Sequence, residues 1–488
     1  METQTTRNRL LTAGRCSRAG NTGVRSVAQV ACAVLALLAC AMPAAAQAGV
    51  GGLDPAFGEG GFATTALNLD AQSRYVELGV APDGSAVMSE AAGFIVRFGP
   101  EGSPDTTFGE SGKLLVFRED PIIGGGAGGK QQFYPRNVVI DSEGRLLVFG
   151  QETDPSSQYS PGAVAESWAV VLRLTPQGEP DPTFGGGRGF IRSGFGLHSR
   201  FSRHFPSVTA LVGSVDSRDR PVLVAGATEV FFGACYAKGG LDMFPRAVVR
   251  LTEAGRTDHS FGGGDGLAPI TGSTSFPGLG IDDRDRPVVG VGSLVQPEPG
   301  CRAGTTLIRL REDGQRMRGF GPRGTQAFKR QHLAFVAPSG AIFLADQHRR
   351  TLRVTRLRPS GDLDTGFGRA GTAAVRLPVA AGNHVRLVGA DAEGRVLLAG
   401  FLGRNDPFSE TKGPKHPSLV VARLLPDGRM DSSFGEGGWI ITKVPEPLEV
   451  TSTAATLDPQ GRLLLAVTDT APEQTEGGYL LARYLLGP

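Results

Sequence analysis

The chain has 488 residues, of which 40% are hydrophobic and 20% charged, and its formal net charge is +2. Glycine (71 residues) and proline (33) are abundant, but no glycine recurs at every third position, which excludes a collagen triple helix. The many aliphatic side chains exclude a wholly disordered chain, so this composition favours a fold with many turns and short strands.

Residues 1–48 have the pattern of a bacterial secretory signal peptide. A basic segment precedes an apolar run over 27–42, and small residues permit cleavage after Ala46 or Ala48. The run of 16 residues is short for a membrane span, and no longer apolar run follows, so we expect no membrane span. Cys40 loosely fits a lipoprotein signal. We therefore expect a secreted or periplasmic protein, with an outer-membrane lipoprotein anchored at Cys40 as the alternative.

Removal of this leader changes the sign of the net charge. The leader contains five of the 50 basic residues and one of the 48 acidic residues, which leaves 45 and 47 and a net charge of −2. A near-neutral chain lacks the basic footprint of a nucleic-acid-binding protein. We expect no nucleic-acid partner.

A short signature that ends in Phe-Gly recurs along the rest of the chain. The spacings between its phenylalanines run from 47 to 77 residues, so the repeated unit has about 47 residues and the excess is loop. One of the seven copies, at Phe320, is degenerate, with Met317 where the others have aspartate. The signature phenylalanines are Phe57, Phe108, Phe184, Phe261, Phe320, Phe367 and Phe434.

Each unit contains four short apolar runs bounded by Gly, Asp and Pro. In one unit the first three cover 138–140, 146–150 and 170–174, and the fourth follows the signature. Such runs predict a four-stranded antiparallel meander. Seven meanders arranged radially predict an all-β fold, a seven-bladed β-propeller that occupies residues 49–488 as a single domain.

The two ends of this region predict how the ring closes. The region opens with a signature and a fourth strand over Phe57–Leu67, and it ends with a third strand over 480–484. We expect the N-terminal strand to complete the last blade, because this leaves no open sheet edge at the junction.

The repeated Asp-x-x-Phe-Gly-x-x-Gly, followed by Asp-x-x-Gly-Arg and Val-Arg-Leu, resembles the delta-60 repeat family of bacterial β-propellers over residues 53–488. That family is a domain of unknown function that is common in exported bacterial proteins. The resemblance therefore implies a fold and an exported location, and it implies no catalytic residue.

An arginine recurs on the third strand of every unit. A side chain present in every blade usually serves the blade, so we interpret these arginines as structural partners of the signature aspartates rather than as a polyanion site. The turn aspartates, such as Asp141, are interpreted as turn formers rather than calcium ligands. The seven arginines are Arg97, Arg173, Arg250, Arg309, Arg356, Arg423 and Arg483.

The long loops predict a ligand surface. They connect second to third strands or fourth to first strands, and in an antiparallel meander both kinds of loop leave the same end. Arg136, His332 and Arg386 each lie eight residues before the glycine of a first tight turn, so we predict them as ligand-binding residues at the channel mouth. The long loops cover 118–133, 151–167, 193–206, 227–246, 293–304, 401–417 and 470–477.

No recognised catalytic motif occurs. The sequence contains no His-Glu-x-x-His, Gly-x-Ser-x-Gly or Cys-x-x-Cys, and we expect no catalytic residue, metal or cofactor. The leading hypothesis is an exported binding or scaffold module for a polymer, peptide or protein ligand. The alternative is a hydrolase or lyase with its site at the channel mouth. Convergent carboxylates or histidines would favour the enzyme, whereas a flat, aromatic or arginine-lined mouth would favour binding.

Cys235 and Cys301 are the two cysteines that follow the leader. They occupy matching positions in adjacent units, 14 residues after Pro221 and Pro287 respectively. An exported protein can keep a disulfide, and both cysteines are expected in long loops on one face. We predict a disulfide between them.

Overall fold

The computed structural model divides the chain into two compact units, Met1–Gln47 and Ala48–Pro488. The described residues all belong to the second unit and contain no α-helix, and thus none long and apolar enough to cross a membrane. The leader, Cys40, Cys235 and Cys301 lie outside them, so those expectations stay predictions. The structure describes residues 51–66, 76–90, 93–116, 132–153, 167–197, 208–227, 246–270, 278–294, 303–321, 324–329, 332–348, 350–378, 384–402, 418–445, 450–469 and 478–487.

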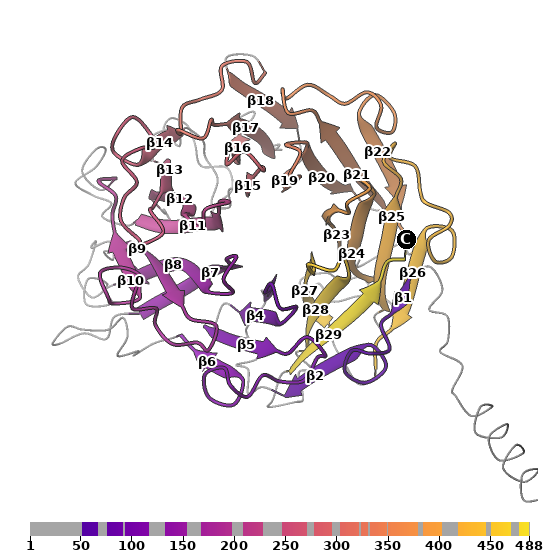
Figure 1. Cartoon of the computed structure of the whole chain (residues 1–488). Helices are drawn as coiled ribbons and strands as arrows, with labels where there is room; N and C mark the ends of the chain where they lie inside the picture. The colour runs from indigo at the N-terminus through magenta and orange to yellow at the C-terminus, as the bar shows by residue number, and fades with distance from the viewer. Residues whose placement is uncertain are drawn as a thin grey trace, which may run out of the picture. The chain divides into compact units, whose positions relative to one another are not determined.

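The strands form seven antiparallel sheets arranged as the blades of a propeller (Figure 1). The first three blades are β3 (Val76–Val80), β4 (Ala86–Glu90), β5 (Phe94–Phe98) and β6 (Lys113–Leu115); β7 (Gln132–Ile140), β8 (Leu146–Thr153), β9 (Ser167–Leu174) and β10 (Phe190–Ser193); and β11 (Val208–Val215), β12 (Pro221–Ala227), β13 (Arg246–Arg250) and β14 (Leu267–Ile270). The next three are β15 (Gly278–Ile281), β16 (Pro287–Leu294), β17 (Ala303–Arg309) and β18 (Thr325–Lys329); β19 (His332–Val336), β20 (Ile342–His348), β21 (Thr351–Leu357) and β22 (Thr372–Arg376); and β23 (His384–Ala390), β24 (Val396–Leu402), β25 (Ser418–Leu424) and β26 (Trp439–Lys443).

The seventh blade joins the two ends of the described chain. It contains β27 (Val450–Leu457), β28 (Leu463–Asp469), β29 (Gly478–Leu485) and the N-terminal β2 (Phe62–Ala66), with the short β1 (Gly52–Leu53) also paired to β29. In the β2–β29 register, Phe62 lies opposite Ala482. The predicted closure by the N-terminal strand is therefore confirmed, although Leu67 lies outside the described residues.

The innermost strands close the ring around a central channel. The first strand of each blade contacts the first strand of the next, and β27 of the last blade contacts β3 of the first (Figure 1). The predicted seven-bladed propeller of four-stranded antiparallel blades is confirmed.

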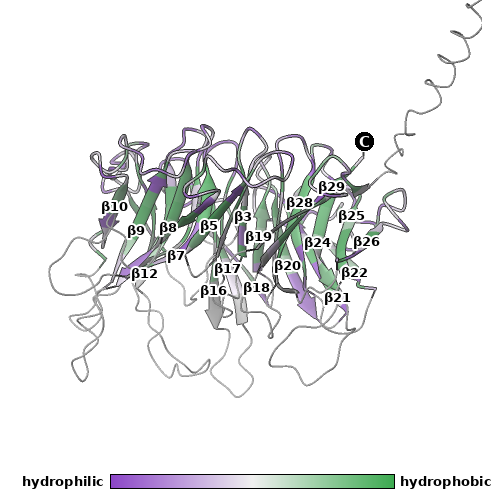
Figure 2. Cartoon of the chain, turned by 90° about the horizontal axis from the view of Figure 1, so that it is seen from below, coloured by the Kyte–Doolittle hydropathy of each residue, from purple (hydrophilic) through white to green (hydrophobic). Residues whose placement is uncertain are grey.

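The central strands of a blade are apolar on both faces because each blade packs between two others. β24 is buried along its whole length. Leu397 belongs to a cluster with Leu463 of the seventh blade, whereas Leu398 belongs to a cluster with Phe343 of the fifth. Successive side chains of a strand point to opposite faces, so a continuous apolar run supplies the interfaces on both sides. Figure 2 shows hydrophobic residues along most strands of the ring.

The repeated arginine, aspartate and phenylalanine form a clamp between blades. The Nε of Arg173 donates to Asp181 at 2.7 Å, its Nη1 donates to the backbone oxygen of Glu253 in the next blade at 2.6 Å, and its guanidinium lies 4.6 Å from the Phe184 ring centre. Arg173 is 1% exposed. The interpretation of these arginines as structural is confirmed. Equivalent pairs between arginine and the signature aspartate are Arg97–Asp105, Arg250–Asp258, Arg356–Asp364, Arg423–Asp431 and Arg483–Asp54.

The fourth blade replaces this clamp with another, because Met317 stands where the aspartate would be. There Arg309 bonds to Asp282, which heads the first tight turn of the same blade and also holds Arg286 at 2.7 Å. The Nε of Arg309 is buried without a hydrogen-bond partner, whereas the same atom hydrogen-bonds to aspartate in the second, third, fifth, sixth and seventh blades.

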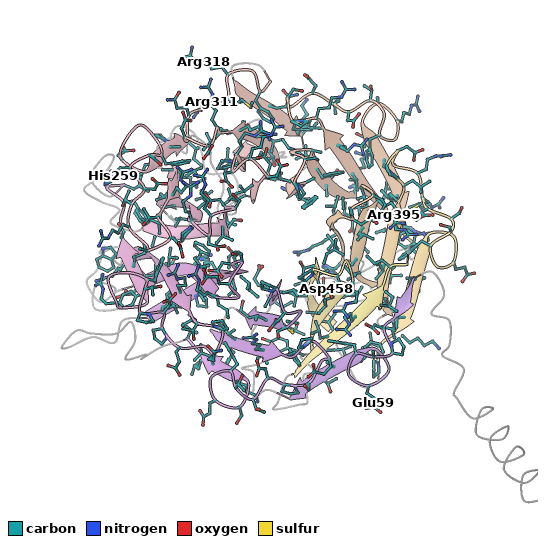
Figure 3. All side chains as sticks on the ribbon, viewed as in Figure 1. Glu59, His259, Arg311, Arg318, Arg395 and Asp458 are labelled. Carbon is teal, nitrogen blue, oxygen red and sulfur yellow. The ribbon has the colours of Figure 1, made fainter. Side chains whose placement is uncertain are left out.

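The turn aspartates fold their own turns, as predicted. Asp141 accepts from the backbone amides of Glu143 at 3.0 Å and Arg145 at 2.9 Å, and from the Arg145 Nε at 2.6 Å. Arg395 and Asp458, labelled in Figure 3, belong to the same kind of turn in the sixth and seventh blades. These turns and the clamps lie where first strands end and third strands end, and we call this end of the ring the turn face.

Candidate binding site in the central channel

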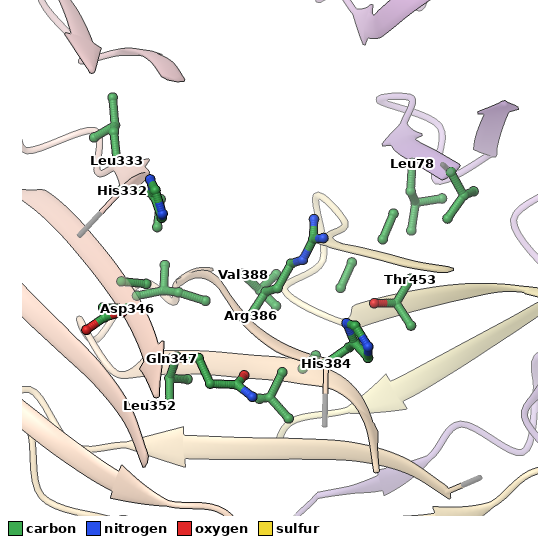
Figure 4. Close-up of a pocket in the computed structure, with 18 of the residues that line it drawn as sticks. Leu78, His332, Leu333, Asp346, Gln347, Leu352, His384, Arg386, Val388 and Thr453 are labelled. Carbon is green, nitrogen blue, oxygen red and sulfur yellow. The ribbon is translucent and has the colours of Figure 1, made fainter. Parts of the chain in front are cut away.

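A cavity of about 820 Å³ lies between the innermost strands of four neighbouring blades, β3, β19, β23 and β27 (Figure 4). Its volume is within the usual range for small-molecule pockets, about 300–1,000 Å³. β19 and β23 begin at the lining residues His332 and His384, so the cavity lies near the end of the channel that is opposite to the turn face. We call this end the loop face, because the connections expected to be long leave from it.

Three charged or titratable lining residues lie at one level of the ring. In the sheet register, Glu77 lies opposite Ser89, His332 lies opposite Ala345, and Arg386 lies opposite Ala399. Each of these opposite residues is the fourth residue of the second strand of its blade. The sheet register therefore brings side chains from the first, fifth and sixth blades to the same depth of the channel.

The structure brings together two of the three predicted residues, His332 and Arg386. Arg136 does not line the cavity, and its Nη2 donates to Gln151 Oε1 at 3.3 Å. No residue of β7 is among the described residues that line the cavity, and a β-bulge at Arg136 also moves it off the level of His332 and Arg386, which Asn137 occupies instead. The Asn137 Oδ1 accepts from the Gly213 amide at 2.8 Å, so this position joins two blades.

Sequence analysis did not identify Glu77, because a strand without a bulge has one residue fewer between its channel-facing side chain and the turn glycine. β19 and β23 each contain a bulge between the lining residue and the turn, but β3 pairs with β4 without one. Glu77 therefore lies seven residues before its turn glycine, Gly84, and not eight. A bulge inserts one residue and moves every earlier side chain to another register.

The titratable and charged side chains at this level face the channel, unlike the clamp arginines, which are buried or half-buried and bonded within the protein. His332 and Arg386 are exposed to the channel, and neither has a hydrogen-bond or ion-pair partner in the described part of the chain. Glu77 also reaches channel water, but the surrounding strands desolvate its carboxylate and raise its pKa to about 7, against the attraction of Arg386. A strongly shifted pKa in a cavity is typical of functional sites.

Other polar lining residues surround this level. His384 stacks on Phe401, with ring centres 4.9 Å apart, and Asp346 pairs with Arg353 at 3.9 Å. Figure 4 shows Gln347 and Thr453 together with aliphatic side chains such as Leu78, Leu333 and Val388. Within the described ranges, no three His, Cys, Asp or Glu side chains are grouped so that they could hold a metal ion.

No family model and no curated protein matches the chain. Among solved structures, the chain is similar to a protein of unknown function from Dyadobacter fermentans DSM 18053, with 12% identity over 86% of this chain and 99% of that chain and a TM-score of 0.37. It is similar to polysaccharide lyase Uly1, with 10% identity over 84% and 89% and a TM-score of 0.44. It is also similar to an intramolecular trans-sialidase from Ruminococcus gnavus, with 10% identity over 84% and 94% and a TM-score of 0.36. At these identities no activity carries over to this chain.

Proposed function

We propose that this protein is an exported binding module whose ligand enters the channel cavity from the loop face. One observation carries the proposal: Arg386 and His332, from two different blades, face the cavity without a hydrogen-bond partner among the described residues. The clamp arginines of the same molecule are bonded to carboxylates and to backbone oxygens. Polar side chains that the fold does not use are available to a ligand.

The propeller supports this role mechanically. The lining residues project from strands that are hydrogen-bonded within blades, and side chains held on rigid elements lose little freedom when a ligand binds. The leader and the resemblance to exported delta-60 repeat propellers support a location outside the cytoplasm, where such a module meets external ligands.

A thermal-shift screen of short glycans, peptides and cell-wall fragments tests the proposal. The wild type is compared with Arg386→Ala and with Arg376→Ala, a matched loss of one arginine on the outer strand β22. A cavity ligand should raise the melting temperature of the wild type and of Arg376→Ala, and it should have little effect on Arg386→Ala. Ligands that stabilise all three proteins equally would contradict a site in the cavity.

Glu77 supports a second candidate function, an enzyme with its site in the same cavity. A carboxyl group with a pKa of about 7 is suited to general acid–base work near neutral pH. The test is product formation from any ligand that the screen finds. An enzyme converts the ligand and loses turnover but not binding in Glu77→Gln, whereas a binding module returns the ligand unchanged.

A further inference from the structure

We propose that the channel cavity binds a sugar acid, either free or at the end of an acidic polysaccharide, and that Arg386 anchors its carboxylate. This inference rests on the proposed function, because it names the ligand class of the same cavity. The guanidinium of Arg386 projects into open space between β19 and β3 (Figure 4). Its planar fork of donors matches the two oxygens of a carboxylate.

The charges around the cavity favour a single negative charge on the ligand. Among the lining residues that the structure describes, Arg386 is the one permanent cation, whereas Glu77 and Asp346 are acidic. Asp346 is engaged by Arg353 at 3.9 Å. One cation can balance one carboxylate, whereas the second negative charge of a phosphate dianion has no permanent cation to meet among the described lining residues.

The remaining lining suits a ligand that combines hydroxyl groups with carbon faces. Gln347 and Thr453 carry groups that donate and accept hydrogen bonds, and Leu78, Leu333 and Val388 supply aliphatic surface beside them (Figure 4). A sugar acid presents a carboxylate, several hydroxyls and apolar C–H surface within one ring. Pockets of this kind use a few polar groups to orient a ligand on mainly apolar walls.

Glu77 makes this binding depend on pH. Below a pH of about 7 the carboxyl group is neutral, and above it the carboxylate repels an incoming anion and competes for Arg386. The other charged or titratable groups among the described lining residues are His332 on β19, His384 on β23 and Asp346 on β20, whereas β27 contributes Thr453, Ala454 and Ala455, which do not titrate. The strand β7, which packs against β3, carries Arg136, but Arg136 does not line the cavity. Affinity for a carboxylate should therefore fall as the pH rises through about 7.

Isothermal titration calorimetry with the full mature chain tests the proposal. The probes are galacturonate and trigalacturonate, with galactose and inorganic phosphate as controls. We expect both acids to bind at pH 6, and to bind about tenfold more weakly at pH 8, as expected for one linked proton. Equal affinities would indicate that one sugar acid fills the site, and a tighter trimer would indicate the end of a polysaccharide; both results support the proposal.

Four variants separate the contributions. Arg386→Ala should weaken binding of both acids by at least about tenfold, the usual value of a hydrogen-bonded charge. Arg386→Lys keeps the charge and should restore part of the affinity, and Arg376→Ala should bind as the wild type does. Glu77→Gln should bind equally well at pH 6 and pH 8. Unfolding midpoints measured beside each titration exclude loss of fold as the cause.

The possible failures are distinguishable. If neither acid binds, or galactose or phosphate binds as tightly as galacturonate, the sugar-acid inference is overturned. The binding module still stands if another ligand from the screen loses affinity in Arg386→Ala. If the acids bind equally well to the wild type and Arg386→Ala, both the inference and the proposed site are overturned. A pH dependence that persists in Glu77→Gln overturns the part assigned to Glu77.

Discussion

Two arginines of the sixth blade differ in what surrounds them. Arg423, on β25, is 1% exposed, bonds to Asp431 at 2.7 Å and to the Leu486 backbone oxygen at 2.6 Å, and lies over Phe434. Arg386, on β23, is exposed to the channel and makes no hydrogen bond within the described ranges. The first recurs in every blade and the second is particular to its own blade. The comparison teaches that the repeated arginines hold this ring together, whereas Arg386, which lies outside the repeat, makes no hydrogen bond among the described residues, as the proposed binding site requires.

The largest expected effect is on stability, at the clamp. Arg423→Ala leaves Asp431 with an unpaired charge at a buried position, so the free energy of unfolding should fall by about 3–5 kcal/mol. Arg386→Ala breaks no hydrogen bond among the described residues and should change stability by no more than about 0.5 kcal/mol, as surface substitutions usually do. Urea denaturation followed by fluorescence measures both changes. Equal losses of unfolding free energy in the two variants would contradict the distinction between clamp arginines, which stabilise the fold, and the channel arginine, which is proposed to bind a ligand.

The fourth blade offers a sharper form of the same comparison. Asp282 bonds to two arginines, Arg286 and Arg309, whereas the equivalent Asp391 of the sixth blade bonds to Arg395 at 2.6 Å and serves no clamp arginine. Asp282→Asn should therefore cost about 1–3 kcal/mol more than Asp391→Asn, the usual value of one hydrogen bond to a charged group. Denaturation midpoints of the two variants measure the difference. A larger loss for Asp391→Asn would contradict the substitute clamp.

The fold could be predicted from the sequence because its determinants are local and repeated. The Phe-Gly signatures mark every blade, and the spacing of Arg173 and Asp181 across one turn allows their pairing to be anticipated. The level of each channel side chain depends on bulges, which have no one-residue signature. Arg136 was therefore grouped with His332 by counting residues, and Glu77, on the unbulged β3, was missed.

A signal for Glu77 was nevertheless present in the sequence. The other residues of β3 (Val76–Val80) are Val, Leu and Gly, and the carboxyl group of Glu77 interrupts that apolar run. Its electrostatic interaction with Arg386 joins residues more than three hundred positions apart, on the first and sixth blades, which ring closure brings to either side of the seventh blade. Reasoning from one strand at a time cannot find such a pair.

A smaller effect is expected when the missing clamp aspartate is restored. Met317→Asp places a carboxylate near the unpartnered Nε of Arg309, and the backbone there already has the clamp geometry, since the Met317 amide donates to the Arg309 oxygen at 2.9 Å. In the Asp282→Asn background this change should recover about 1 kcal/mol of unfolding free energy. Met317→Asn is the matched control, because it supplies a similar shape without the charge. A further loss of stability in the double variant would show that Met317 matters for its packing alone.

The smallest effect concerns pH, and it has opposite signs in the two regions. Burial alone would raise the pKa of Asp431, but its hydrogen bonds to Ser433 and Arg423 outweigh burial and lower the pKa below its ordinary value, so the clamp loses stability only in acid. Burial raises the pKa of Glu77 in the folded chain to about 7, above its ordinary value of 4.5, so the folded chain binds more protons than the unfolded chain between these values. The free energy of unfolding should therefore decline slightly as pH rises from about 4.5 to about 7, and then level off.

Glu77→Gln isolates that decline, because it removes the titrating group and keeps its shape. The wild type should lose stability relative to Glu77→Gln as the pH rises from 5 to 8. Urea denaturation of both proteins at the two pH values measures this loss. The change should be small because the carboxyl group still reaches channel water, which limits its desolvation. Arg376→Ala, whose arginine lies on the outer strand β22, should not alter the pH dependence of stability. If the wild type instead gains stability relative to Glu77→Gln as the pH rises, Arg386 stabilises Glu77 as a carboxylate, and the channel arginine then resembles the clamp arginines.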